Sequence, residues 1–135
     1  MPVSGLQRLL CSMQPRLNGG IYVYAVVPHG QVLPADGVVA TFRETEGTTV
    51  ILEESAARDA GLCVLFRAAW ITLTVDSALD AVGFTAAFAQ ALGAAGISCN
   101  VVAAAHHDHV FVPAERAELA LQCLLELQRS AQAMA

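Results

Sequence analysis

The run His106-His107-Asp108-His109 carries the side chains best suited to metal chemistry. Imidazole and carboxylate groups are ligands for zinc and other transition metals. Adjacent residues in a tight turn cannot all reach one ion, and the remaining histidine, His29, is distant in the sequence. The run therefore favours a turn with hydrogen-bonded histidines, with His107 and Asp108 as its best ligand contacts. We predict no metal and no cofactor; a metal-dependent hydrolase using His107, Asp108 and His109 is the lesser alternative.

Candidate nucleophiles are few. The four cysteines are widely spaced and form no CxxC pair, which predicts reduced, buried thiols: Cys11, Cys63, Cys99 and Cys123. A Cys99–His107 pair would lack a group to orient the base and donors to stabilise an oxyanion. The chain contains no lysine, which excludes Schiff-base chemistry and a P-loop. We therefore predict a protein that is not an enzyme.

Composition points to assembly rather than to nucleic acid. Apolar residues make up 56% of the 135 residues and charged residues 14%, against about 25% in ordinary domains. A monomer has difficulty hiding so much apolar surface, so we expect a homodimer or a higher, even-numbered oligomer. The net charge of −5 and the scattered arginines argue against a nucleic-acid partner.

A membrane partner is not expected either. The apolar stretch 84–105 is interrupted by polar residues and glycines, among them Gln90, Gly93 and Asn100. The first twenty residues lack the apolar run and cleavage site of a signal peptide. We expect a cytoplasmic protein.

Hydrophobic periodicity predicts the order of the elements. The first half contains a short helix at 6–13, strands at 21–27, 38–43 and 48–52, and a short helix at 53–60. The second half contains a strand at 65–75, a helix ending before Gly96, strands at 97–104 and 109–112, and a last helix running from Pro113 to about residue 129.

The second half is one strand short of a split βαβ unit, because it has the order β-α-β-β-α. A strand of the first half can supply the missing one. Strand 65–75 has two distinct apolar faces, one with Ala69, Ile71 and Leu73 and the other with Phe66 and Trp70. We predict an α+β fold: a mixed, largely antiparallel sheet with helices on one face.

Several segments in this order resemble the ACT domain, the ferredoxin-like βαββαβ amino-acid-sensing module of metabolic enzymes. They are SMQP at 12–15, ATFRETEGTT at 40–49, WITLTVDSALDAVGFTAAF at 70–88 and AGISCNVVAAAHHDHVFVP at 95–113. The likeness extends to a small stand-alone bacterial family that pairs two ACT-like halves, here 1–64 and 65–135. The second half is also similar to the regulatory units of aspartate kinases and to the tandem-ACT arginine sensors of animals.

The resemblance implies a ligand pocket between the loop after the first strand of the second half and the next strand. It maps to Asp76, Ser77, Ala78, Leu79, Val82 and Gly83, with Asn100 and Val101 on the strand. Free amide groups at a helix start attract a ligand carboxylate, and glycine allows close approach. Asp76 would then meet the ligand's ammonium. Alternatively, Asp76 and Asp80 only cap the helix and Gly83 serves packing.

We therefore expect a non-catalytic, allosteric regulatory protein that binds an amino acid or a similar small zwitterion. The alternative is a ligand-free oligomerisation or partner-interaction module. Such a module would use the sheet edge and the wide apolar face of the last helix.

Overall fold

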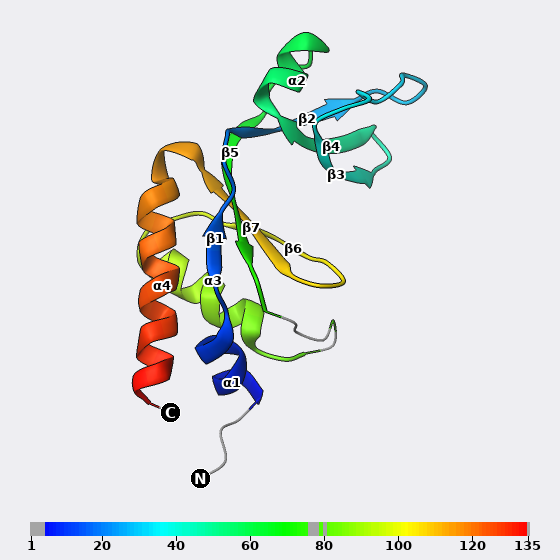
Figure 1. Ribbon diagram of the computed structural model, residues 1–135. Helices are drawn as coiled ribbons and strands as arrows, with labels where there is room; N and C mark the ends of the chain where they lie inside the picture. Colours follow the sequence, from blue (N-terminus) through cyan, green and yellow to red (C-terminus); the bar gives the residue numbers. More distant parts are fainter. Residues whose placement is uncertain (1–4, 76–78, 80, 135) are drawn as a thin grey trace.

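The computed structural model describes residues 5–75, 79 and 81–134 (Figure 1). The elements of the first half are α1 (Gly5–Ser12), β1 (Pro15–Leu17), β2 (Tyr22–Val27), β3 (Val38–Arg43), β4 (Thr48–Glu53) and α2 (Glu54–Asp59). Those of the second half are β5 (Phe66–Leu73), α3 (Phe84–Ala94), β6 (Asn100–Ala103), β7 (Asp108–Pro113), a 3-10 turn (Ala114–Arg116) and α4 (Ala117–Ala133).

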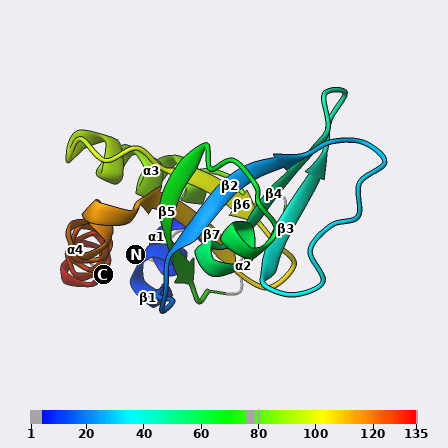
Figure 2. The ribbon, with the colours of Figure 1, turned by 90° about the horizontal axis from the view of Figure 1, so that it is seen from above.

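The seven strands form one antiparallel sheet in the order β3-β4-β2-β5-β7-β6, and β1 pairs with β5. Strands β3 and β6 are therefore the two ends of this order. The helices α3 and α4 lie at one end of the molecule and the β3–β4 hairpin lies at the other (Figure 2). The predicted α+β fold with a largely antiparallel sheet is confirmed.

Strand β1 completes the second half of the molecule. It lies antiparallel to β5, so that β1-β5-β7-β6 with α3 and α4 has all the parts of a split βαβ unit. The unit is permuted, because its last strand comes from the start of the chain. This confirms the prediction that the first half supplies the missing strand. The domain boundary at residue 64 stays a prediction.

Strands β1 and β2 follow one another along the same edge of β5. Leu17 pairs with Ile71 and Tyr22 with Ala68, so β1 and β2 are separated by two more residues than the facing stretch of β5. Asn18 holds this irregularity: its N–H donates to the Trp70 carbonyl at 2.9 Å and its Nδ2 to Thr72 Oγ1 at 2.9 Å. The two additional residues form a bulge that bends the strand without reversing it.

The helix-covered face of the sheet holds the aliphatic core. Ala69, Ile71 and Leu73 of β5 are buried there beneath α1, α3 and α4, as the predicted strand faces required. Met13, at the end of α1, is fully buried in the same cluster. A smaller cluster joins β2 and β4 to Ala57 of α2. Because apolar burial is the main stabilising term, α1 and β1 are integral to the second half.

The other face of the sheet is rich in aromatic residues, and we call it the aromatic face. Its buried members are Tyr22, Ile51, Ala68 and Phe111; Tyr24, Val39, Ala40, Phe66 and Trp70 pack against them and are partly buried. Within the described ranges, no helical residue belongs to this cluster. The aromatic face is therefore the part of the core that is open to a ligand or a partner.

Met13→Ala tests whether the start of the chain belongs to the core of the second half. Truncating a buried methionine removes apolar contacts and leaves a cavity, so we expect a loss of about 2–5 kcal/mol in the free energy of unfolding. Met134→Ala is the matched control, because Met134 is 80% exposed and should change stability by less than about 0.5 kcal/mol. Urea denaturation measures both. Equal effects would mean that α1 does not anchor to the core.

Candidate functional site

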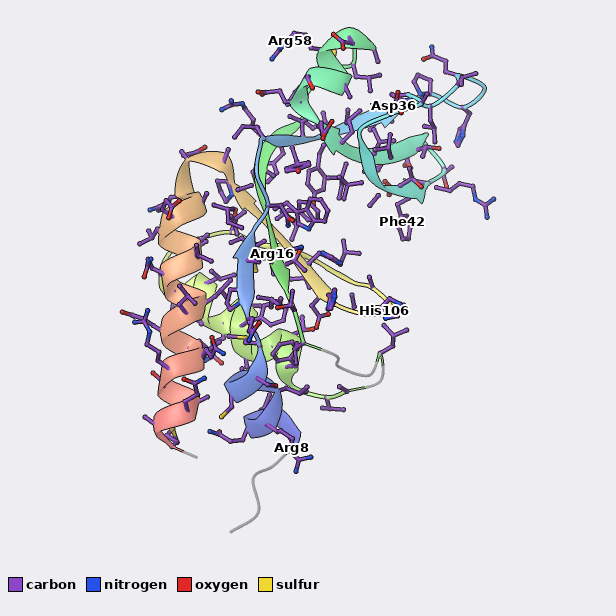
Figure 3. The ribbon with its side chains drawn as sticks, viewed as in Figure 1. Arg8, Arg16, Asp36, Phe42, Arg58 and His106 are labelled. Atoms are coloured by element: carbon purple, nitrogen blue, oxygen red, sulfur yellow. The ribbon has the colours of Figure 1, made fainter. Side chains whose placement is uncertain are left out.

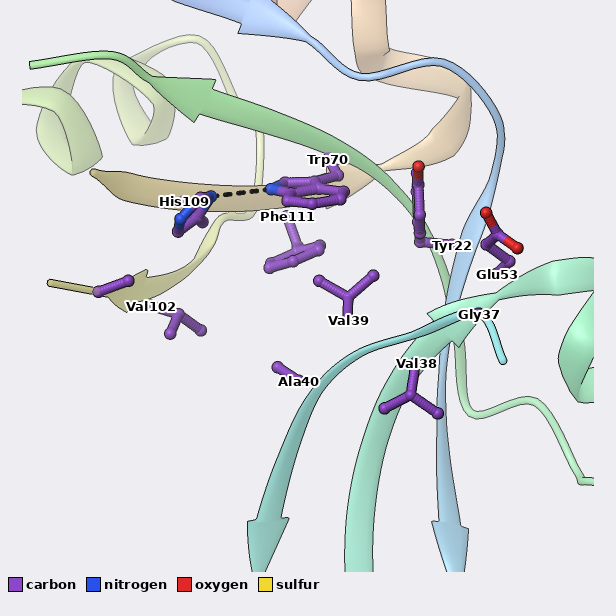
Figure 4. Close-up of a pocket in the computed structure, with 11 residues that line it drawn as sticks. Tyr22, Gly37, Val38, Val39, Ala40, Glu53, Trp70, Val102, His109 and Phe111 are labelled. Atoms are coloured by element: carbon purple, nitrogen blue, oxygen red, sulfur yellow. Dashed lines mark hydrogen bonds between the residues drawn. The ribbon is translucent and has the colours of Figure 1, made fainter. Parts of the chain in front are cut away.

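A groove lies on the aromatic face between the two ends of the sheet. Its main cavity of about 460 Å³ is lined by residues of both halves (Figure 4): Tyr22, Gly37, Val38, Val39, Ala40, Glu53, Trp70, Val102, Ala104, His109 and Phe111. A second cavity of about 410 Å³ shares Ala40 and Val102 with the first and adds Asn100 and Val101. Both volumes fall within the range of about 300–1,000 Å³ typical of small-molecule sites.

The groove arises because β3 and β6 face each other without pairing. Phe42 projects from β3 toward the β6–β7 hairpin, which carries His106 at its tip (Figure 3). The β3 and β6 residues that line the second cavity, among them Ala40 and Val102, lie on opposite sides of it. The groove between the edge strands therefore arises only in the tertiary structure, and no pattern in the sequence predicts it.

A β-bulge at Val39 shapes the β3 wall. Val38 pairs with Leu52 and Ala40 pairs with Ile51, which leaves Val39 as an extra residue. Strand side chains ordinarily alternate between faces. Val38 packs with the α2 cluster, whereas Val39 and Ala40 both pack on the aromatic face. The bulge thus turns two successive side chains toward the groove.

Aromatic rings form the floor of the groove. The Trp70 and Phe111 rings are near-parallel, 6.1 Å apart at 19°, and Tyr22 meets Trp70 edge-to-face at 5.2 Å and 89°. Tyr24 contacts Phe111 at 5.9 Å in the same edge-to-face manner. Such contacts between cross-strand neighbours hold each ring in one orientation. The groove therefore presents a preorganised apolar surface.

His109 is locked to this floor. Trp70 Nε1–H donates to His109 Nδ1 at 3.0 Å, so the neutral ring carries its proton on Nε2 and can donate from there. Burial lowers the pKa of His109, and the neighbouring His107 lowers it further. Both influences keep the ring neutral at neutral pH. His109 thus offers the groove a hydrogen-bond donor without a charge.

Glu53 lies at the opposite end of the main cavity from His109 (Figure 4). It is exposed, and it is the direct cross-strand partner of Tyr22. The pKa of Tyr22 is raised, mainly by burial and secondly by the Glu53 charge. Among the described residues Glu53 forms no ion pair, whereas its neighbour Glu54 pairs with Arg67. The cavity therefore has one unpaired carboxylate at its rim.

The loop predicted to bind the ligand is only partly described. Asp76, Ser77 and Ala78 lie outside the described residues, as does Asp80. Leu79 and Val82 are 71% and 89% exposed. Gly83 has φ +95°, and a Cβ there would lie 3.4 Å from Leu6 Cδ2. Leu79, Val82 and Gly83 do not line the groove, and the assignment of the whole loop stays a prediction.

Asn100 and Val101 are the two predicted site residues that line the groove, through its second cavity. They face residues of β3 and β4 there, such as Thr41 and Ile51. The structure therefore connects these two positions to the first half of the chain.

The His106–His109 run is divided by the fold. His106 is exposed, Asp108 is 5% exposed at the start of β7, and His107 Nδ1 is buried with no hydrogen-bond partner in the described part of the chain. Neither His107 nor Asp108 lines the groove, so their ligand role stays a prediction. In the same part of the chain, no three His, Cys, Asp or Glu side chains group so as to hold a metal ion.

Cys99 and Cys123 are poor nucleophiles, because their surroundings raise the pKa of each thiol. Burial raises the pKa of the Cys99 thiol, and burial together with Glu126 raises that of Cys123. A raised pKa reduces the reactive thiolate. All four cysteines are free thiols. The prediction that all are buried is wrong: Cys63 is exposed, in the irregular segment between α2 and β5, and Cys11, Cys99 and Cys123 are only partly buried.

Sequence reasoning did not identify Tyr22, Glu53, Trp70 and His109 as parts of one site. One signal was present: strand 65–75 places its aromatic residues on the face opposite its aliphatic ones. A strand whose only role is to bury one face under helices does not require aromatic residues on the opposite face. It indicated a second, chemically different surface.

Comparison with known proteins identifies the family. An ACT domain profile matches residues 2–69, and a second ACT domain profile matches residues 66–126. The chain therefore belongs to the ACT domain family, and this membership supports a ligand-binding regulatory role. A search of curated proteins gave no match.

Three solved structures are similar to this chain. A Vibrio cholerae protein of unknown function and possible transport role is 46% identical, with a TM-score of 0.80 over 91% of this chain and 95% of that one. An Agrobacterium tumefaciens protein is 18% identical, with a TM-score of 0.72 over 86% and 89%. The ligand-free regulatory subunit of aspartate kinase from Thermus thermophilus is 13% identical, with a TM-score of 0.63 over 87% and 97%. The last two likenesses concern the fold.

The helices in the described ranges include none that is both long and apolar enough to cross a membrane.

Stability should fall between about pH 7.5 and pH 5.5, in part through His109. Its pKa in the folded state is lowered, whereas an unfolded imidazole titrates near about 6.5. The unfolded state then binds the proton more tightly, so the stabilisation is full above about pH 6.5 and is lost as the pH falls through the folded pKa. Urea denaturation at both pH values measures the effect.

His109→Gln should reduce this pH dependence, because glutamine can accept the Trp70 hydrogen bond but does not titrate. His106→Gln, at an exposed neighbouring position, is the control and should keep the wild-type pH dependence. A His109→Gln variant as pH-sensitive as wild type would contradict the role assigned to His109.

Proposed function

We propose that this ACT domain protein is a non-catalytic sensor that binds an amino acid or a similar small zwitterion in the groove between β3 and β6. The observation that carries the proposal is the cavity of about 460 Å³, formed jointly by the two halves. A bound ligand would contact β3 of the first half and β6 and β7 of the second half. Ligand binding is thereby coupled to the relative position of the two halves, as a regulatory protein requires.

The chemistry of the lining favours binding over catalysis. Its polar side chains are few, and the Glu53 carboxylate and the His109 imidazole lie at opposite ends of the cavity. A general base must lie within hydrogen-bond reach of the proton that it removes, and a nucleophile must lie beside its base. Apolar walls with a few polar groups are typical of small-ligand sites.

We further propose that the protein acts as a homodimer through its sheet edges. Phe42 on β3 is 71% exposed and Val102 on β6 is 38% exposed. Both strands end the sheet order, so each has a backbone edge without a partner strand among the described residues. An exposed apolar edge strand is a template for pairing with another chain.

Filling the groove should abolish ligand binding. In a thermal-shift screen against the twenty amino acids, a ligand at about 100 times its dissociation constant stabilises by about 2.7 kcal/mol, a shift of several degrees. Ala40→Phe places a ring at the position shared by both cavities and should remove the shift. Ala86→Phe, at an exposed position of α3, is the matched control and should keep it.

The loop assignment predicts the opposite pattern. If the ligand binds between the 76–83 loop and the strand that carries Asn100 and Val101, Gly83→Val and Asp76→Asn should lose the shift and Ala40→Phe should keep it. Melting points without ligand must accompany each variant, since Gly83 has a left-handed backbone that valine adopts only with strain. A ligand insensitive to Ala40→Phe would exclude the groove.

Light scattering at micromolar concentration should show a dimer or a higher even-numbered species. A single species of 14.1 kDa, the mass of one chain, would contradict the assembly. Phe42→Asp should shift the population toward the monomer, because it places a charge on the exposed β3 edge. Val32→Asp is the control: Val32 is 93% exposed, lies outside every strand, and its substitution should leave the oligomer unchanged.

A further inference from the structure

The formal charge of the groove is negative. Of the 11 residues that line the main cavity, Glu53 is the only one with a formal charge at neutral pH, because His109 is held neutral by its surroundings. Among the described residues the lining contains no arginine, and the chain has no lysine. An anionic ligand would find no opposite charge in this cavity. A cationic group would find one.

Glu53 and Tyr22 form the recognition point for that cation. They are directly paired across β4 and β2, and Tyr22 lies between Glu53 and Trp70 (Figure 4). A cation beside the carboxylate is therefore also next to an aromatic ring, which adds a cation–π attraction. Glu53 is available for this contact, because the nearby Arg58 and Arg67 both pair with Glu54 instead.

The backbone of Gly37 brings the β3 wall up to this carboxylate. Glu53 N–H donates to the Gly37 carbonyl at 2.8 Å. A Cβ on Gly37 would lie 3.1 Å from Glu53 Oε2 and 2.8 Å from Ala56 Cβ, and Gly37 has φ +81°. Only glycine fits here without a shift. The carboxylate therefore lies close to the Gly37 backbone, at one end of the cavity.

His109 lies too far from the Glu53 end of the cavity for one end of a ligand to contact both residues. The His109 and Tyr22 rings lie 5.6 Å and 5.2 Å from the Trp70 ring, on opposite sides of it (Figure 4). An α-amino and an α-carboxylate group share one carbon and cannot span that separation. A ligand that uses both ends must be elongated, with a cation near Glu53 and a hydrogen-bond acceptor near the His109 Nε2–H.

We propose that the groove selects a small, elongated organic cation, namely an amino acid with a cationic side chain or a related amine. This inference rests on the proposed function and specifies its ligand. The cation contacts Glu53 and Tyr22, the apolar chain lies over Trp70 and against Val39, and the acceptor end meets His109. Dicarboxylic amino acids are rejected, since nothing in the lining compensates their second negative charge.

L-Lysine and L-norleucine are the matched probes, because they differ only by the terminal ammonium group. Calorimetry should give lysine an affinity about 3- to 30-fold higher, the combined effect of a partly exposed ion pair and a cation–π contact. Cadaverine, which keeps the cation and lacks the carboxylate, should also bind more tightly than norleucine. Raising the salt concentration should reduce the preference for lysine.

Glu53→Gln should remove most of the preference for lysine over norleucine. Glu46→Gln makes the same change of charge in the β3–β4 turn, outside the groove, and should keep the preference. Melting points without ligand show whether either variant is folded.

The outcomes separate this inference from the proposed function. If norleucine binds as tightly as lysine and Ala40→Phe blocks both, the groove is a neutral amino-acid site and the cation inference is wrong. A preference for lysine that survives Glu53→Gln would also overturn it, because the charge would be recognised elsewhere. If neither probe, nor any of the twenty amino acids, binds wild type, both the inference and the proposed function fail.

Discussion

Strand β5 is the element on which the rest of the structure depends. It pairs with β7 on one edge and with both β1 and β2 on the other, so backbone hydrogen bonds from the two halves of the chain meet on one strand. Its two faces are buried against different surroundings, the aliphatic core under the helices and the aromatic face. Because side chains alternate along a strand, any displacement of β5 would disturb both clusters together.

This sharing explains why the two ACT matches do not correspond to two independent bodies. Strand β1 completes the sheet of the second half. Strand β2, which follows it in the chain, pairs with β4, and β4 pairs with β3, so these three strands form the sheet of the first half. The bulge at Asn18 is the point where the chain passes from one to the other. Contacts between the halves are therefore made by the backbone itself as well as by side chains, which suits a protein that transmits occupancy of a site.

The groove follows from the same arrangement. Bending the sheet leaves β3 and β6 facing each other without pairing, and the bulge at Val39 widens the apolar wall. The Trp70–His109 hydrogen bond then fixes the tautomer of a histidine that is kept neutral by burial. What remains is an aromatic cavity with a donor at one end and an unpaired carboxylate at the other. These properties support the proposed binding role.

The sequence by itself determined the elements other than β1 and the 3-10 turn, the two faces of β5, the need for a strand from the first half, and the ACT resemblance. Each depends on local periodicity or on residues in a fixed order, which a single chain displays directly. Only the tertiary structure decided which residues form the groove, because Tyr22, Glu53, Trp70 and His109 lie on four different strands. Their proximity depends on the curvature of the sheet and on two bulges. No local sequence pattern predicts the curvature of a sheet. Asn100 and Val101 were named from sequence because they follow a family pattern, and their role in a site stays a prediction. Glu53 was assigned to the start of the predicted helix 53–60, whereas the structure places it at the end of β4.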